Sequence, residues 1–259
     1  NQYIILNPGR TAGAIEFYQT LKNGGLNKDI HIGEAQTLVY ACRIIEPGKV
    51  NIIGVKDRVL LSGYPASKTE NIITKLKPLY QCFYPAQNVL RTSFENIGAI
   101  FHPSVLLFNA ASIERGEQFY FYRDMTPGMA NIIESLDAER VAVAKAYGID
   151  LIPAKNWISY AYEGVTGNSL CERMQNNPAY YDILAPTTIH CRQITEDVPT
   201  GIIPMSELGD VAGIETPIMD SIIEMCSAML KKNFRKEGRT LKNLGFENMT
   251  VEEILKSIH

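Results

Sequence analysis

The chain has 259 residues, of which 46% are hydrophobic and 20% are charged, and its formal net charge is −3 at pH 7. This composition predicts a globular protein with a substantial core, in one large domain or two ordinary ones. Acidic and basic residues are mixed along the sequence, and no apolar run approaches the roughly 18 residues that span a bilayer. We therefore exclude nucleic acid and membrane as partners.

Five cysteines are scattered along the chain without a C-x-x-C pair. A disulfide framework or a zinc site would require closer, paired spacing. We therefore expect reduced thiols in a cytoplasmic protein, and no metal ion. The sequence starts without an initiator methionine and enters a strand pattern at once, so we expect that a preceding segment has been removed.

Up to about residue 90, strand patterns alternate with helix patterns. Apolar and β-branched runs predict strands at residues 3–6, 30–35, 37–44, 50–55 and 58–64, separated by turn residues. Helices are expected from Thr11, as the N-cap, to Asn23, and from about Ser67 to Leu76. This alternation is typical of an α/β domain.

Beyond that point the sequence predicts helix after helix. Apolar residues recur at helical spacing over 104–116, 130–148 and 216–232, and Thr250 with Glu253 forms a capping-box pattern before a short final helix. The predicted fold class is therefore an α/β region followed by an all-helical domain.

His102 is one of four histidines and stands directly before Pro103 and an apolar run. Proline disfavours the helical conformation in the residue before it and tolerates the first helical position, which makes His102 a candidate N-cap. The positive end of the helix dipole would keep the ring neutral, whereas a nearby carboxylate would reverse this effect. From the residues alone, a histidine that merely caps a helix is the stronger interpretation.

A second polar cluster covers residues 188–201. It contains Arg192, Glu196 and Asp197, and we expect Pro199 and Gly201 to force an irregular loop after them. Arg192 could bind a carboxylate with its planar guanidinium group, and Asp197 could orient a histidine. The alternative is a solvated, charged loop with an internal ion pair.

Five segments in this order resemble the opine dehydrogenases of the octopine/nopaline group, and most closely the N-(1-D-carboxylethyl)-L-norvaline dehydrogenases. They are NPGRTAGAIEF, HIGEAQTLVYACR, NIGAIFHPSVLLFNA, RQITEDVPTG and NFRKEGRTLKNLGF, and the resemblance runs along essentially the whole chain. It implies that residues 1–88 are the C-terminal half of a Rossmann dinucleotide-binding domain. Residues 89–259 would be a helical substrate-binding and catalytic domain with 6-phosphogluconate-dehydrogenase-like architecture, with a cleft between the two.

The resemblance also implies an activity and roles for single residues. Members of this family reductively join the amino group of an L-amino acid to an α-keto acid such as pyruvate, with NAD or NADP as cofactor. The implied site residues are a catalytic dyad of His102 and Asp197, the substrate-binding residues Arg192 and Asn96, and the cofactor-binding residues Gly9, Arg10 and Glu34.

Two features depart from the family pattern. The family usually carries an asparagine four residues before the histidine, and this chain has Gly98 there. The glycine-rich G-x-G-x-x-G turn that seats the pyrophosphate in a dinucleotide fold is also absent from the sequence. The sequence therefore lacks both the side chain that positions substrate at this point in the family and the turn that seats the pyrophosphate.

Two other interpretations remain. One is a related reductase of the ketopantoate or 3-hydroxyacid type, although such enzymes use a lysine-centred site and no lysine is close to His102 in the sequence. The other is a non-catalytic helical fragment for dimerisation or ligand binding, which the absent glycine-rich turn favours. The long helical patterns also offer surfaces for a homodimer.

Overall fold

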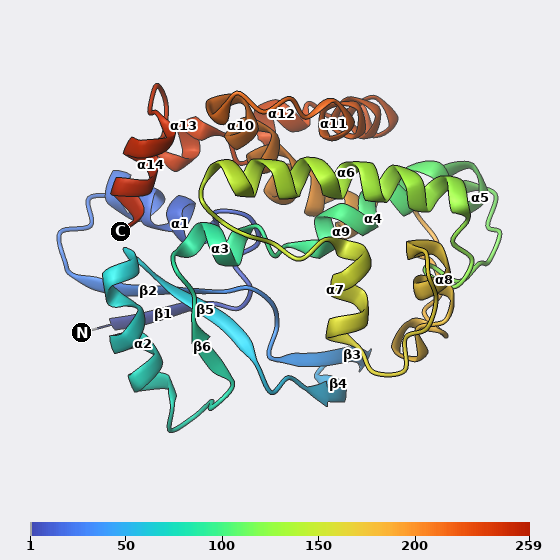
Figure 1. Ribbon diagram of the computed structural model, residues 1–259, viewed down its shortest axis with the longest axis horizontal. Coiled ribbons are helices and arrows are strands. Elements are labelled where there is room, and N and C mark those ends of the chain that lie inside the picture. The colour runs from blue at the N-terminus through green and yellow to red at the C-terminus, as the bar shows by residue number, and fades with distance from the viewer. Residues whose placement is uncertain (1) are drawn as a thin grey trace. The chain divides into compact units, whose positions relative to one another are not determined.

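The computed structural model describes residues 2–259, which form two compact units. The first unit contains the described residues up to Asn96 together with Leu241–His259, and the second contains Ile97–Thr240. Strands occur mainly in the early part of the chain and helices dominate the rest (Figure 1). The predicted succession of an α/β region and a helical region is confirmed.

A mixed four-stranded sheet organises the first unit. Its strands are β1 (Gln2–Leu6), β2 (Ile30–Ala35), β5 (Val59–Tyr64) and β6 (Phe83–Pro85), in the order β1-β2-β5-β6. β1 and β2 are parallel, β2 and β5 antiparallel, and β5 and β6 parallel. Helix α1 (Gly13–Asn23) connects β1 to β2, and α2 (Thr69–Leu76) connects β5 to β6. The strands β1, β2 and β5 and the helices α1 and α2 lie close to their predicted positions. The strand β6 was not predicted, and the N-cap of α1 is Ala12 rather than the predicted Thr11.

The core of the first unit lies where α2 covers the sheet. Gly63 of β5 permits this contact, because a Cβ atom there would lie 2.8 Å from the backbone nitrogen of Thr69. The buried apolar residues that pack together are Ala35, Val39, Val59, Leu61, Ile72, Cys82 and Phe83.

A separate hairpin is formed by β3 (Tyr40–Glu46) and β4 (Lys49–Val55). The strand predicted at 37–44 begins later, because Gln36 exchanges hydrogen bonds with Leu60 of β5 and the chain bends between Gln36 and Tyr40. Gly48 closes the turn with a φ of 82°, a conformation that favours glycine.

The C-terminal segment belongs to the first unit. Helix α13 (Leu241–Leu244) contacts α1, and the carbonyl of His259 after α14 (Val251–Ile258) accepts a hydrogen bond from the amide of Ser67 at 3.3 Å. The predicted capping box of Thr250 and Glu253 is present. Helix α3 (Val89–Ser93) is also part of this unit, so the compact helical unit is shorter at both ends than the expected domain 89–259.

Helices build the second unit, together with one isolated antiparallel bridge between Tyr120 and Leu184 in the described chain. The helices are α4 (Ile97–Phe108), α5 (Ala110–Glu114), α6 (Pro127–Ala146), α7 (Ala154–Ala161), α8 (Leu170–Gln175), α9 (Arg192–Thr195), α10 (Ile203–Ala212), α11 (Pro217–Leu230) and α12 (Phe234–Glu237). The long α6 is central, since α4, α7, α8, α10 and α11 all contact it (Figure 1). The helices predicted at 130–148 and 216–232 are confirmed, whereas the one predicted at 104–116 is divided between α4 and α5 at Asn109.

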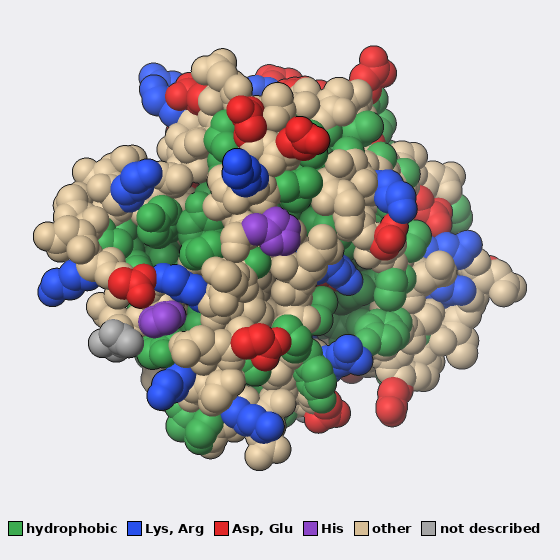
Figure 2. Space-filling model, turned by 60° about the vertical axis from the view of Figure 1, so that its left-hand side comes forward, with side chains coloured by type: hydrophobic (Ala, Val, Ile, Leu, Met, Phe, Trp, Pro, Cys, Tyr) green, Lys and Arg blue, Asp and Glu red, His purple; other side chains and the backbone are tan. Residues whose placement is uncertain are grey.

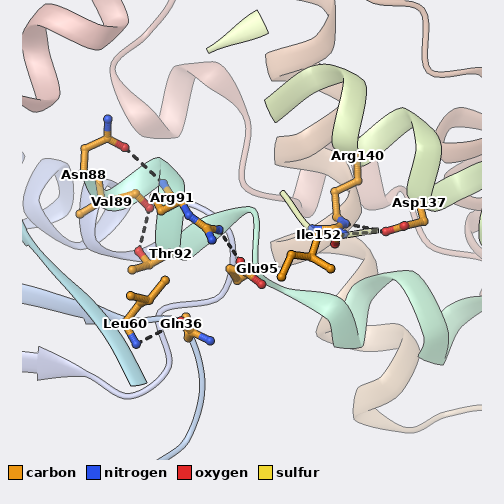
Figure 3. A network of polar contacts seen from close by, with 10 residues as sticks. All are labelled: Gln36, Leu60, Asn88, Val89, Arg91, Thr92, Glu95, Asp137, Arg140 and Ile152. Atoms are coloured by element: carbon orange, nitrogen blue, oxygen red, sulfur yellow. Dashed lines mark hydrogen bonds and ion pairs between the residues drawn. The ribbon is translucent and has the colours of Figure 1, made fainter. Parts of the chain in front are cut away.

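A buried ion pair stabilises the second unit. Arg140 lies 2.7 Å from the carboxylate of Asp137 and also donates to the carbonyl of Ile152 (Figure 3). Asp137 accepts a hydrogen bond from the amide of Ala154 at the start of α7. Both charged side chains are almost fully buried. The pair therefore fixes the connection between α6 and α7.

The surface carries charges of both signs. Figure 2 shows acidic and basic side chains interspersed over the visible face rather than gathered in a block of one sign. Among the described residues, no helix is both long and apolar enough to cross a membrane.

Candidate active site

His102 lies in the middle of α4 and not at its start, so its predicted role as an N-cap is wrong. The helix begins at Ile97 because the apolar residues before the histidine, including Ile100 and Phe101, are buried in the core. Pro103 is accommodated inside the helix, where it removes only the hydrogen bond to the carbonyl of Ala99. The predicted effect of a helix N-terminus on the ring therefore does not apply.

Both ring nitrogens of His102 have hydrogen-bonding partners. Nδ1 lies 2.6 Å from Oδ2 of Asp197, and Nε2 lies 3.1 Å from the hydroxyl oxygen of Tyr122. The side chain of Asp197 is 2% exposed and that of His102 is 26% exposed. Since a carboxylate only accepts, Nδ1 carries the hydrogen and Nε2 is the nitrogen that can exchange a proton.

Asp197 comes from a distorted helical segment that packs on α4. It follows α9 and directly precedes the π-helix η3 (Val198–Ile202), which continues into α10. The irregular loop predicted at Pro199 and Gly201 is therefore wrong: both residues lie in the π-helix. Because α4 contacts both α9 and η3, His102 and Asp197 meet although 95 positions separate them in the sequence. Single π-helical turns are frequent at functional sites.

Arg192 is the first residue of α9 and its side chain is exposed. It forms no ion pair or side-chain hydrogen bond with another residue of the described chain, so it does not form the expected internal ion pair. Its guanidinium group is free to bind an external carboxylate.

An aromatic cluster surrounds the histidine and was not assigned to the site from the sequence. The ring of Tyr122 stacks on Tyr180 at 4.2 Å between centroids, and the ring of Phe121 meets His102 edge-on at 5.8 Å. The hydroxyls of Tyr180 and Tyr162 are 2.6 Å apart. The run FYFY at 119–122 was the only signal in the sequence, and it is equally typical of a core.

The first unit holds Glu34, one of the residues expected to bind the cofactor. Its side chain is fully buried and accepts hydrogen bonds from the amide of Ala14 at 2.8 Å and from the hydroxyls of Thr92 and Ser93, each at 2.7 Å. A Cβ atom on Gly9 would lie 2.5 Å from this side chain. The close approach of the Glu34 side chain to the backbone at position 9 thus requires a glycine there. The carboxylate of Glu34 lies at the N-terminus of α1.

Two further predicted site residues of the same unit are close to Thr11: Asn96 contacts its side chain, and Arg10 precedes it in the chain. Asn96 is buried and donates from Nδ2 to Oγ1 of Thr11 at 3.3 Å. Arg10 and Ala12 both have positive φ angles, 62° and 60°, so the turn after β1 is sharply folded. The structure therefore gathers Gly9, Arg10, Glu34 and Asn96 in the first unit and His102, Asp197 and Arg192 in the second.

Comparison with known proteins identifies the family. Residues 85–230 match the family model described as "NAD/NADP octopine/nopaline dehydrogenase, alpha-helical domain". The chain belongs to this family.

Curated relatives and solved structures agree with this result. An opine dehydrogenase of Arthrobacter sp. (strain 1C) is 36% identical over 99% of this chain, which spans 71% of that enzyme. A vitopine synthase of Allorhizobium ampelinum is 27% identical over 83% of the chain, which spans 60% of that protein. The structure of an octopine dehydrogenase with NADH and L-arginine superposes with a TM-score of 0.81 at 22% identity, covering 98% of this chain and 71% of that one.

Family membership confirms three inferences from the sequence: the resemblance to opine dehydrogenases, the fold class, and the assignment to NAD- or NADP-dependent oxidoreductases that act on CH–NH groups. The departure at Gly98 is located on α4, four residues before His102 and thus on the same helix face. The family's asparagine side chain would lie beside the histidine, and this chain has none there.

Proposed function

We propose that this protein catalyses the reductive condensation of the amino group of an L-amino acid with an α-keto acid such as pyruvate, with NADH or NADPH as reductant. The observation that carries the proposal is the contact of His102 with the buried carboxylate of Asp197 at 2.6 Å. It supplies a ring with a fixed tautomer and one nitrogen available for proton exchange.

The reaction needs proton transfers that one histidine can perform. The amine attacks the keto carbon, the carbonyl oxygen must be protonated twice before it leaves as water, and the resulting imine is reduced. His102 would donate and accept these protons, and the nearby charge of Asp197 would stabilise the protonated ring. A general acid–base group of this kind contributes about 10²–10⁴-fold to the rate.

Arg192 would bind a substrate carboxylate. Its exposed guanidinium group can form two parallel hydrogen bonds to a carboxylate and so fix the approach of the keto acid. Asn96 would hydrogen-bond to substrate or to the nicotinamide side of the cofactor. Since its amide already contacts Thr11, it would act together with the turn after β1.

NADH or NADPH supplies the hydride when bound. The turn after β1 is in a suitable place to contact that cofactor: Gly9 and Arg10 lie at the C-terminal end of β1, which is parallel to β2. They do not fit the pyrophosphate, because the carboxylate of Glu34 already occupies the N-terminus of α1. We therefore assign Gly9 and Arg10 to the nicotinamide end, and Glu34 to holding their turn in shape.

The site favours this function over the alternatives. The side chains that contact the ring of His102 are Asp197, Tyr122 and Phe121, and no lysine is among its contacts in the described chain, unlike in a ketopantoate-type site. A purely structural module would not need an aspartate that is 2% exposed and bonded to a partly exposed histidine.

The wider assignments follow from the same proposal. Residues 1–88 would be the C-terminal half of the dinucleotide-binding domain, and the helical region from residue 89 would bind substrates and carry the dyad. We place the enzyme in the cytoplasm, because no disulfide joins the described cysteines. A homodimer remains a prediction.

The test is oxidation of NADH and NADPH by the full-length protein with pyruvate alone, with a pool of L-amino acids alone, and with both. Oxidation that requires both substrates and yields an N-carboxyethyl amino acid, identified by mass, supports the proposal. Oxidation with pyruvate alone would indicate a hydroxyacid dehydrogenase instead.

A further inference from the structure

Tyr122 is the side chain that meets the reactive nitrogen of His102. Its hydroxyl lies 3.1 Å from Nε2, and Asp197 lies 2.6 Å from Nδ1. Both nitrogens of the ring are thus engaged, so a substrate oxygen cannot bond to the ring directly unless Tyr122 moves away.

The surroundings of Tyr122 hold it in place. The side chain is only 8% exposed and is stacked on Tyr180 at 4.2 Å, with Phe101 and Phe121 edge-on at 6.4 and 4.7 Å. Four rings therefore form one packed group with Tyr122 at its centre.

The backbone on either side of Tyr122 is also fixed. The amide of Phe121 donates to the carbonyl of Ile183 at 2.7 Å, and the amide of Ala185 donates to the carbonyl of Phe119 at 2.9 Å. The carbonyl of Tyr122 itself accepts from the amide of Met125 at 3.2 Å. Displacement of the tyrosine would disrupt both this backbone pairing and the aromatic packing.

We propose that the hydroxyl of Tyr122 relays the proton between Nε2 of His102 and the oxygen of the keto-acid substrate. The proton on Nε2 moves to the phenolic oxygen while the phenolic proton moves to the substrate oxygen. The imidazolium becomes neutral, the substrate oxygen gains one proton, and Tyr122 is unchanged. A hydroxyl can do this because it donates and accepts hydrogen bonds at the same time.

This inference rests on the proposed function and is tested in the same two-substrate assay on the full-length protein. Tyr122→Phe keeps the ring and removes only the hydroxyl. We expect kcat to fall about a hundredfold, within the range of a lost acid–base step, and KM for both substrates to change little. Tyr180→Phe is the matched control, since it removes a hydroxyl from the adjacent stacked ring, and we expect its kcat to stay close to wild type.

Two results would overturn the relay. If Tyr122→Phe is as fast as the wild type or faster, the hydroxyl only competes with the substrate for Nε2. If Tyr180→Phe loses as much kcat as Tyr122→Phe, the effect comes from aromatic packing. Absence of two-substrate activity in the wild type itself would instead contradict the proposed function.

A second variant covers the case in which Tyr122→Phe does not fold. Replacing Tyr122 with 3-fluorotyrosine retains the ring and the hydroxyl but makes the hydroxyl more acidic. The relay predicts a shift of the pH profile of kcat, and an unchanged profile contradicts it, because a tyrosine that only fills space would not respond.

Discussion

Asp197 determines what the ring of His102 can do. The carboxylate is buried and bonded to Nδ1, and it therefore fixes both the tautomer and the orientation of a side chain that is itself a quarter exposed. Arg192 lies five positions earlier, at the start of α9, and its positively charged side chain is exposed to solvent. One short segment thus supplies the carboxylate that orients the ring of His102 and the cation that binds the substrate carboxylate in the proposed function.

Replacing Arg192 tests its role in binding. Arg192→Lys keeps the charge but loses the paired hydrogen bonds of the guanidinium group, so we expect KM for the keto acid to rise about tenfold or more while the protein stays folded. Arg115→Lys, at an exposed position in the same unit, is the matched control. An unchanged KM in Arg192→Lys would exclude bidentate binding by this residue.

Lys56 provides a prediction on pH. Burial lowers its pKa to about 8, although its ammonium group donates to Thr37 at 2.6 Å. A lysine whose pKa is lower in the folded than in the unfolded state destabilises the fold when charged, so its unfavourable contribution is complete at pH 7 and fades between about pH 8 and the ordinary value near 10.5.

Lys56→Met should therefore raise the melting temperature at pH 7, and the gain should shrink at pH 10. Thermal unfolding of both proteins at the two pH values measures this, with Lys77→Met at an exposed position as the control. A gain that is the same at both pH values would show that the charge of Lys56 is not the cause.

Only some of the residues of the candidate site could be predicted from the sequence. His102, Asp197 and Arg192 belong to segments that resemble the family, and the structure brings the first two into contact. Tyr122 could not be found, because its role depends on the packing of α4 against a distant turn. Glu34 was expected to face the cofactor, but it accepts hydrogen bonds from Ala14, Thr92 and Ser93, which are far from it in the sequence.

At the scale of elements, proline and glycine residues predicted helix ends that the structure does not have, because packing keeps these residues in helices. Pro103 predicted a helix start, yet α4 runs through it because its apolar first half is buried. Pro199 and Gly201 predicted a loop, yet they extend a helix in the wider π form. Thr216 directly precedes α11, a position in which threonine often caps a helix, but its side chain makes no capping hydrogen bond.

Glu139 of α6 caps α11 instead. Its carboxylate accepts hydrogen bonds from the amides of Ile218 and Met219 at 2.7 and 2.9 Å. Burial raises the pKa of this carboxyl group in spite of the two amide donors. A raised pKa means that the charged form is less favourable in the folded state, so stability falls as the pH rises through the shifted range.

We therefore expect Glu139→Ala to lower the free energy of unfolding by about 1–2 kcal/mol, as for the loss of a helix cap. Glu139→Gln should lose less, because its amide oxygen still accepts a hydrogen bond and carries no buried charge. Chemical denaturation at pH 7 compares the two variants. Equal losses would contradict the capping role.

At the scale of the whole molecule, the chain leaves the first unit at Asn96 and returns to it at Leu241. The sequence could predict the C-terminal helix from its capping box, but not where that helix docks. The segment is attached through the contact of α13 with α1 and through the hydrogen bond from the amide of Ser67 to the carbonyl of His259, which no local pattern encodes.

The C-terminal segment Leu241–His259 belongs to the first unit, and this leads to a further prediction. Ile254 of α14 is fully buried, so Ile254→Ala should lower the free energy of unfolding by about 2–5 kcal/mol. Hydrogen exchange should then show faster exchange in the first unit, including β2 and β5, with little change in residues 97–240. Val251→Ala, on a partly exposed position of the same helix, is the control. Faster exchange confined to 97–240 would contradict the docking of α14 on the first unit.

The most direct test of the account is the turnover number of His102→Ala in the full-length protein with an amino acid, pyruvate and NADH or NADPH. We predict a loss of at least about a hundredfold, because the variant lacks the group that moves the protons, while cofactor binding is retained. Near-normal turnover would remove His102, and with it the contact to Asp197, from the mechanism.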